Sequence, residues 1–93
     1  MIWTAVAKKD SENRNIAFYV AMKVDGRLVF LSRQKDGSWD VYEEVGPVRS
    51  YTIVRRQNCK EFRTAKKWAE RYLHLREWKG ALQCRARLLG YIK

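Results

Sequence analysis

The stretch NCKEFRTAKKWAERYLHLREWK, residues 58–79, decides the fold of this chain. Most of its residues are strong helix formers, and Asn58 stands three positions before Glu61, the spacing of a helix-capping box. At about 100° per residue, its apolar side chains gather on one face and its charged side chains on the other. We therefore predict one long amphipathic helix over about residues 59–78. Its apolar face comprises Phe62, Ala65, Trp68, Ala69, Tyr72, Leu73 and Leu75.

The sequence before this helix predicts β-strands. They are expected at about residues 2–7, 15–24, 27–33, 38–45 and 48–56. Residues 15–24 alternate in the two-residue period of a strand. Asp25-Gly26 and Asp36-Gly37 are typical of two-residue type I′ hairpin turns, which join neighbouring antiparallel strands.

The first of these turns also predicts a register. A type I′ turn at Asp25-Gly26 pairs Val20 with Leu31 and Met22 with Val29. Because these four side chains then share a face, we expect that face to be the core.

The sequence after the long helix supports two interpretations. Lys79-Gly80 is expected to end the helix, because glycine is favoured just past a helix terminus. Residues 81–92 alternate like a strand, yet their Ala, Leu, Gln and Arg content favours a second short helix over about 81–90. The fold class is therefore α+β in a single domain, residues 1–93. We expect an antiparallel meander of four or five strands packed by the long helix and the short one.

Charge is distributed unequally along the chain. The net charge is +10. Residues 1–50 hold eight basic and seven acidic side chains, a net +1, whereas residues 51–93 hold twelve and three, a net +9. This asymmetry indicates a polyanionic partner on one side of the molecule.

The candidate binding residues follow from the helical spacing. Arg63, Lys67 and Arg71 repeat every four residues and form one ridge on the polar face. Trp78 falls beside this ridge, either as a stacking platform or as a core side chain. A solvated outer face without a ligand is the alternative for the ridge itself. The full candidate set is Arg55, Arg56, Lys60, Arg63, Lys66, Lys67, Arg71, Trp78, Arg85 and Arg87.

Catalytic motifs are not found in the sequence. Asp40, Glu43 and Glu44 form the one acidic cluster, but Glu43 and Glu44 point to opposite faces of a strand and do not converge on a metal. His74 has no metal-ligand partner at suitable spacing and is predicted to be a surface residue. We predict no catalytic residue, no metal site and no cofactor. A metal-dependent nuclease and a metal-free ribonuclease are the enzymatic alternatives.

Cysteine content and hydropathy indicate a cytoplasmic protein. Cys59 and Cys84 are predicted to be free thiols, with Cys59 in the first helical turn, where the helix dipole lowers a thiol pKa. No apolar run reaches the roughly 20 residues that cross a bilayer, and no signal-peptide pattern opens the chain.

Residues 38–73 resemble a known family. Strands followed by FRTAKKWAE are similar to the arm-type DNA-binding domain of phage integrases, where a three-stranded sheet precedes a helix that begins Phe-x-Thr. The two N-terminal strands, and the cap and first turn predicted before Phe62, depart from that pattern. The resemblance implies that sheet residues read the major groove. These would be Trp39, Tyr42, Arg49 and Tyr51.

Two functions agree with these observations. The first is a small, basic, non-enzymatic protein that binds RNA or DNA through its C-terminal helical surface, which contacts the phosphate backbone. The alternative is a compact phage-type inhibitor or adaptor that docks its basic face on an acidic host protein or ribonucleoprotein complex. Neither function involves a membrane, and both allow a monomer or a dimer.

Overall fold

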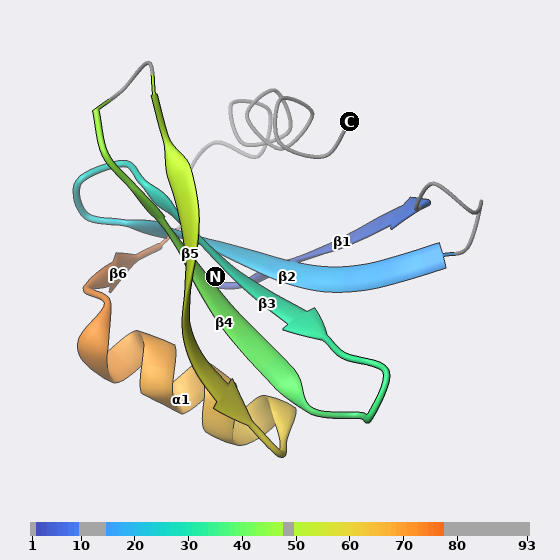
Figure 1. Cartoon of the computed structure of the whole chain (residues 1–93). Coiled ribbons are helices and arrows are strands. Elements are labelled where there is room, and N and C mark those ends of the chain that lie inside the picture. The colour runs from blue at the N-terminus through green and yellow to red at the C-terminus, as the bar shows by residue number, and fades with distance from the viewer. Residues whose placement is uncertain (1, 10–14, 48–49, 78–93) are drawn as a thin grey trace.

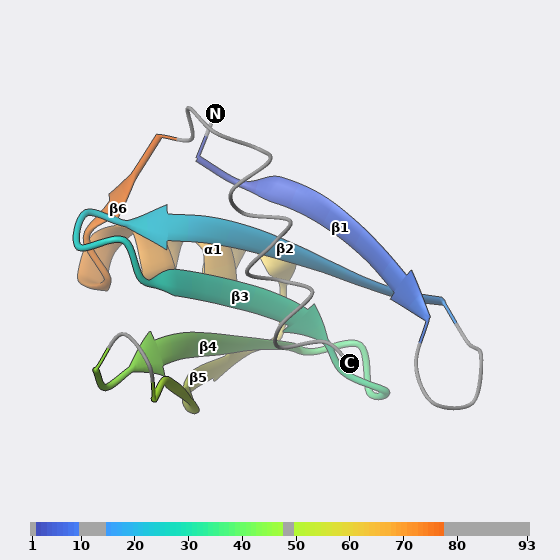
Figure 2. The same ribbon diagram turned by 90° about the horizontal axis from the view of Figure 1, so that it is seen from above.

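The protein is one antiparallel sheet with a helix packed on one face. The computed structural model describes residues 2–9, 15–47 and 50–77. Its elements are β1 (Thr4–Lys9), β2 (Asn15–Lys23), β3 (Leu28–Arg33), β4 (Trp39–Val45), β5 (Thr52–Cys59), α1 (Phe62–Tyr72) and β6 (Leu75–Arg76). The strands lie side by side in the order β1 to β5, with β6 antiparallel to the end of β2 (Figures 1 and 2). The predicted α+β meander is confirmed, while the second helix predicted at 81–90 lies outside the described residues.

The two Asp-Gly sequences form hairpin turns, but of another type than predicted. Lys23 N donates to Arg27 O at 2.7 Å, and Gln34 N donates to Ser38 O at 2.8 Å, so each loop holds three residues. Gly26 and Gly37 have φ of 88° and 87°, the left-handed conformation that follows a type I turn in such loops. Glycine adopts this φ without a Cβ clash, which explains its place at both loop ends.

The longer loop shifts the register of β2 against β3 by one residue. Val20 lies opposite Phe30, and Met22 lies opposite Leu28. The predicted pairs, Val20 with Leu31 and Met22 with Val29, are therefore wrong. A one-residue slip moves the whole set of partners to the other face, because side chains alternate along a strand.

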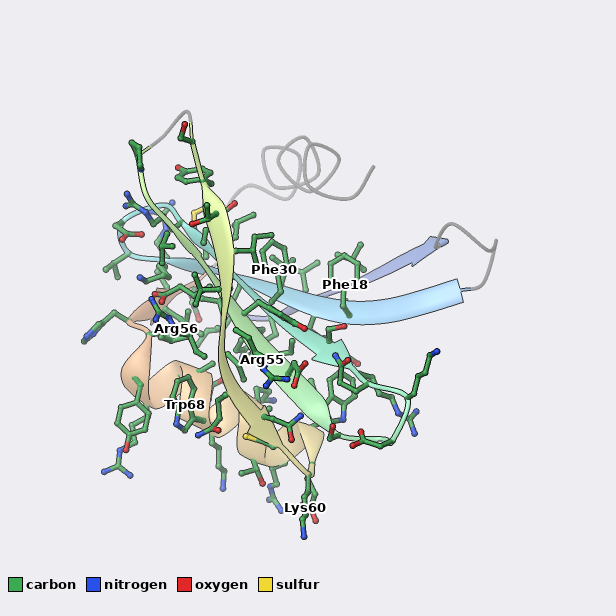
Figure 3. The ribbon with its side chains drawn as sticks, in the orientation of Figure 1. Phe18, Phe30, Arg55, Arg56, Lys60 and Trp68 are labelled. Atoms are coloured by element: carbon green, nitrogen blue, oxygen red, sulfur yellow. The ribbon has the colours of Figure 1, made fainter. Side chains whose placement is uncertain are left out.

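As a result, the sheet has an apolar cluster on each face. The helix-side cluster contains Trp3, Ala21, Val29, Leu31, Val41, Cys59, Ala65, Ala69 and Leu73. The opposite face carries Phe18, Val20, Met22, Leu28 and Phe30, which are also buried. Figure 3 shows Phe18 and Phe30 on the side of the sheet away from α1. The predicted core face is thus divided between two faces.

The helix begins later than predicted and ends earlier. It spans Phe62–Tyr72, whereas the sequence predicted about residues 59–78. Asn58 and Cys59 belong to β5, where they lie opposite Asp40 and Trp39, so strand pairing takes the residues assigned to the cap and the first turn. The N-cap is Glu61, whose side chain makes no capping hydrogen bond.

Small side chains set the packing of α1 on the sheet. Ala65 and Ala69 are fully buried and allow the helix to lie close to β3, β4 and β5. Phe62, the first residue of α1, also packs against the sheet. Its ring centroid lies 4.8 Å from that of Trp39 and 4.5 Å from that of Tyr19. The face of α1 opposite Ala65 and Ala69 is therefore exposed to solvent.

Candidate functional site

The predicted basic ridge lies on the outer face of α1. Arg63, Lys67 and Arg71 are all within the helix and all exposed. At about 100° per residue, they point away from the side that carries Ala65 and Ala69. The ridge extends about 12 Å along the helix axis, since each residue adds about 1.5 Å.

The ridge charges are not neutralised by nearby acids. Within residues 2–9, 15–47 and 50–77, no carboxylate lies within salt-bridge distance of Arg63, Lys67 or Arg71. The acidic residue on the same helix, Glu70, accepts a hydrogen bond from Trp3 Nε1 at 2.9 Å. Among the described residues, the ridge charges therefore have no ion-pair partner and face the solvent.

Arg55 and Arg56 differ from the ridge residues because each faces a buried carboxylate. Arg56 Nε donates to Glu43 Oε1 at 2.8 Å, and Lys23 Nζ donates to Glu43 Oε2 at 2.5 Å. Arg55 Nη1 lies 3.6 Å from Asp40 Oδ2. Each arginine is thus held against a carboxylate of β4, although both side chains are exposed and Arg56 shares Glu43 with Lys23.

A β-bulge explains how two consecutive arginines reach different acids. Val41 lies opposite Gln57, and Tyr42 lies opposite Arg55, so Arg56 is the extra residue of β5. A bulge re-aims side chains and increases local twist. It directs Arg56 to Glu43 on the helix side, while Arg55 meets Asp40 and Tyr42 on the other (Figure 3).

Of the remaining candidate binding residues, only Lys60 and Lys66 belong to the described part of the chain. Lys60 is exposed in the connection between β5 and α1, and Figure 3 shows it at the turn between these two elements. Lys66 is half-buried, with Nζ 5.8 Å from the centroid of the Phe62 ring. Trp78, Arg85 and Arg87 lie outside the described residues.

An aromatic pair beside the ridge was not predicted. Helical spacing predicts Tyr72 on the buried face, yet 53% of it is exposed. Its ring centroid lies 5.3 Å from that of Trp68 and 5.4 Å from Arg71 Cζ. Tyr72 is the last helical residue, and this position at the end of α1 is what leaves its ring uncovered.

The environment shifts the pKa of three groups near the candidate residues. Burial alone would raise the pKa of Glu43, but hydrogen bonds from Lys23 and Arg56 outweigh it and hold this pKa below 4.5. Burial, together with the hydrogen bond to Asp40, raises the pKa of Tyr42. Burial also raises the pKa of Cys59, so the predicted thiol activation is wrong: Cys59 ends a strand and is not in a helical turn.

The acidic residues of β4 serve the fold. Glu44 is fully buried, and its Oε1 accepts from the Leu28 backbone N at 2.7 Å. Asp40 accepts from Tyr42 and Asn58, and Glu43 is held by Lys23 and Arg56. Among the described residues, no three His, Cys, Asp or Glu side chains gather as metal ligands.

The residues implied by the integrase resemblance do not share one surface. Trp39 lies on the helix side and packs against Tyr19 and Phe62, while Tyr42 packs against the cluster on the opposite face. Arg49 is outside the described residues. Trp39 and Tyr42 therefore cannot read one groove together.

Comparisons with known proteins give no family for this chain. A scan against family models, a search of curated proteins and a search of solved structures each found no match. In the described part of the chain, the helix is too short and too polar for a membrane span.

Proposed function

We propose that this protein binds nucleic acid without catalysing a reaction on it, through the basic ridge of α1 and the phosphate backbone of the ligand. The observation that carries the proposal is the unneutralised line of Arg63, Lys67 and Arg71 in a chain of net charge +10. Duplex DNA presents one negative charge per about 1.7 Å of helix axis, so a ridge about 12 Å long meets several phosphates at once.

Lys60 is the next contributor, because it is exposed just before the helix. Arg55 and Arg56 contribute less, since each is already paired with a buried carboxylate. The same reasoning keeps Arg85, Arg87 and Trp78 as sequence-based candidates. Binding of this kind depends on released counterions and weakens steeply with salt.

The test compares two charge-matched double variants. Arg63→Gln with Lys67→Gln removes two ridge charges, and Arg33→Gln with Lys35→Gln removes two exposed charges from the β3–β4 hairpin. Affinity for labelled single-stranded and duplex RNA and DNA is measured by anisotropy over a salt series. The ridge variant is expected to flatten the plot of log K against log salt by about 1.4 to 1.8, and the hairpin variant to leave it unchanged.

Two results would overturn the proposal. One is the absence of binding to any of these nucleic acids at low salt, and the other is an equal loss in both double variants. The alternative, an adaptor or inhibitor on an acidic protein or ribonucleoprotein, is tested by affinity capture from nuclease-treated lysate. A single partner lost only with the ridge variant, together with no binding to naked nucleic acid, would favour it.

A further inference from the structure

An aromatic surface adjoins the end of the basic ridge. Trp68 and Tyr72 lie one turn apart on α1, and their ring planes are inclined by 46°. Arg71, the last residue of the ridge, lies beside them in sequence and places its guanidinium against the Tyr72 ring. One end of α1 thus presents aromatic rings and cationic groups together.

The Tyr72 ring is exposed but held in position. Trp68 is half-buried and packs against the helix-side cluster. Figure 3 labels this side chain on α1. Its ring supports Tyr72 from one side, while 53% of Tyr72 remains accessible. A side chain with two rotatable bonds held in this way loses little conformational entropy when it binds a ligand.

This combination fits an unpaired nucleobase. Every base has a π-face that stacks on an aromatic ring, and a guanidinium plane stacks on bases as well. In a duplex those faces are covered by neighbouring base pairs, so the ring can be used only by a single strand, a bulge or a frayed end. Arg71 links the ring to the ridge, because its guanidinium lies 5.4 Å from the centroid of the Tyr72 ring and Lys67 lies one helical turn before Arg71.

We propose that Tyr72, supported by Trp68 and adjoined by Arg71, is a stacking site for an unpaired base, so that the preferred ligand is single-stranded nucleic acid. This inference rests on the proposed function and adds the class of ligand. Tyrosine, tryptophan and arginine also anchor protein interfaces. The cation of Arg71 against the exposed ring favours a ligand that carries planar groups and phosphates together.

The experiment separates bases from phosphates. The ligands are oligothymidylate and oligouridylate of about 12 nucleotides, a fully abasic strand of the same length, and a duplex of the same length. The proteins are the unaltered chain, Tyr72→Phe, Tyr72→Ala and the control Ile53→Ala, which removes exposed apolar surface from β5. Circular dichroism melts show whether each variant is folded.

The unaltered chain is expected to bind oligothymidylate about 5- to 150-fold more tightly than the abasic strand. Tyr72→Phe and Ile53→Ala should keep this preference. Tyr72→Ala should lose most of it while its affinity for the abasic strand stays unchanged.

Several outcomes would overturn the stacking site. Equal affinity of the unaltered chain for the oligothymidylate and abasic strands would do so without any variant, and so would tighter binding to the duplex. An equal loss for both strands in Tyr72→Ala would mean that the ring acts by positioning Arg71. In each of these cases the chain still binds nucleic acid, whereas binding to none of the ligands would overturn the proposed function as well.

Discussion

Asn58 joins the end of β5 to a buried carboxylate on β4. Its Nδ2 donates to Asp40 Oδ1 at 2.6 Å and to Ser38 Oγ at 2.9 Å. Asp40 is 3% exposed and also accepts from the Tyr42 hydroxyl at 3.0 Å. A buried carboxylate is stable only with such donors, so the amide group of Asn58 is specifically required.

The substitution Asn58→Asp distinguishes this role from a helix cap. Aspartate caps helices about as well as asparagine, so a cap would tolerate the change. Opposite Asp40, the new carboxylate loses the donor and adds a like charge. We expect the free energy of unfolding at pH 7 to fall by about 1–3 kcal/mol, measured by urea denaturation.

The reciprocal change is the control for Asn58→Asp. Adding Asp40→Asn to it restores one amide opposite one carboxylate and should recover part of the loss. Unchanged stability in Asn58→Asp alone would contradict the observed pairing.

Glu43 gives a prediction about pH. Its pKa lies below 4.5 in the folded protein, because the hydrogen bonds from Lys23 and Arg56 outweigh the effect of burial. A lowered carboxylate pKa stabilises the fold above the unfolded pKa, and this contribution is lost as pH falls through the folded pKa. Glu43→Gln should therefore cost about 1–3 kcal/mol at pH 7, with a difference from the unaltered chain that shrinks below about pH 4.5.

Urea denaturation over a pH series measures this difference. Glu61→Gln is the matched control, since Glu61 is exposed at the start of α1 and its side chain makes no capping hydrogen bond. The prediction fails if Glu43→Gln is as stable as the unaltered chain at pH 7, or if the difference does not depend on pH.

At the scale of elements, the end of α1 depends on one left-handed residue. Leu73 N donates to Ala69 O at 2.9 Å, and the next residue, His74, has φ of 51°. His74 O then accepts from Val24 N at 2.9 Å, which brings the chain back to the sheet as β6. The turn from helix to strand therefore requires a backbone conformation that side chains with a Cβ disfavour.

Replacing His74 with glycine should stabilise the protein. Glycine removes the left-handed cost of about 1–2 kcal/mol but adds about 0.5–1 kcal/mol of unfolded-chain entropy, so a gain of about 0.5 kcal/mol is expected. His74→Ala is the control, because alanine keeps the Cβ and should gain no stability over the unaltered chain. Thermal melts compare the three proteins, and an alanine variant as stable as the glycine variant would contradict the argument.

The elements differ in how far the sequence predicts them. Asp25-Gly26 and Asp36-Gly37 predict hairpins correctly, but Asp-Gly fits both a two-residue and a three-residue loop, so the register was not determined. The spacing of Asn58 and Glu61 fits a capping box, yet strand pairing with Asp40 prevails. Local patterns therefore predict which elements form, while contacts between strands decide their bounds and partners.

At the scale of the whole molecule, the candidate site is partly predictable for the same reason. The ridge of Arg63, Lys67 and Arg71 follows from helical periodicity alone. The partners of Arg55 and Arg56 depend on a bulge, which no pattern in β5 indicates. The exposure of Tyr72 depends on where the helix ends and on what the sheet leaves uncovered.

Cys59 reports on the integrity of the whole fold. It is buried between the sheet and α1, and burial raises its pKa. In a Cys84→Ser background, it should react with a thiol reagent at least about 100-fold more slowly than in urea, because reaction requires an opening of the helix-side cluster. Equal labelling rates in the folded and unfolded chain would show that the thiol is accessible.

The hydrogen bond between Trp3 and Glu70 has a consequence for the order of folding. Neighbouring strands of the meander close short loops, whereas Trp3 Nε1 and Glu70 Oε1 join residues 67 positions apart. The chain entropy lost in closing a loop grows with its length, so this link is expected to form after the hairpins. The link between α1, which presents the basic ridge, and the residues before β1 is therefore expected to be among the last contacts to form.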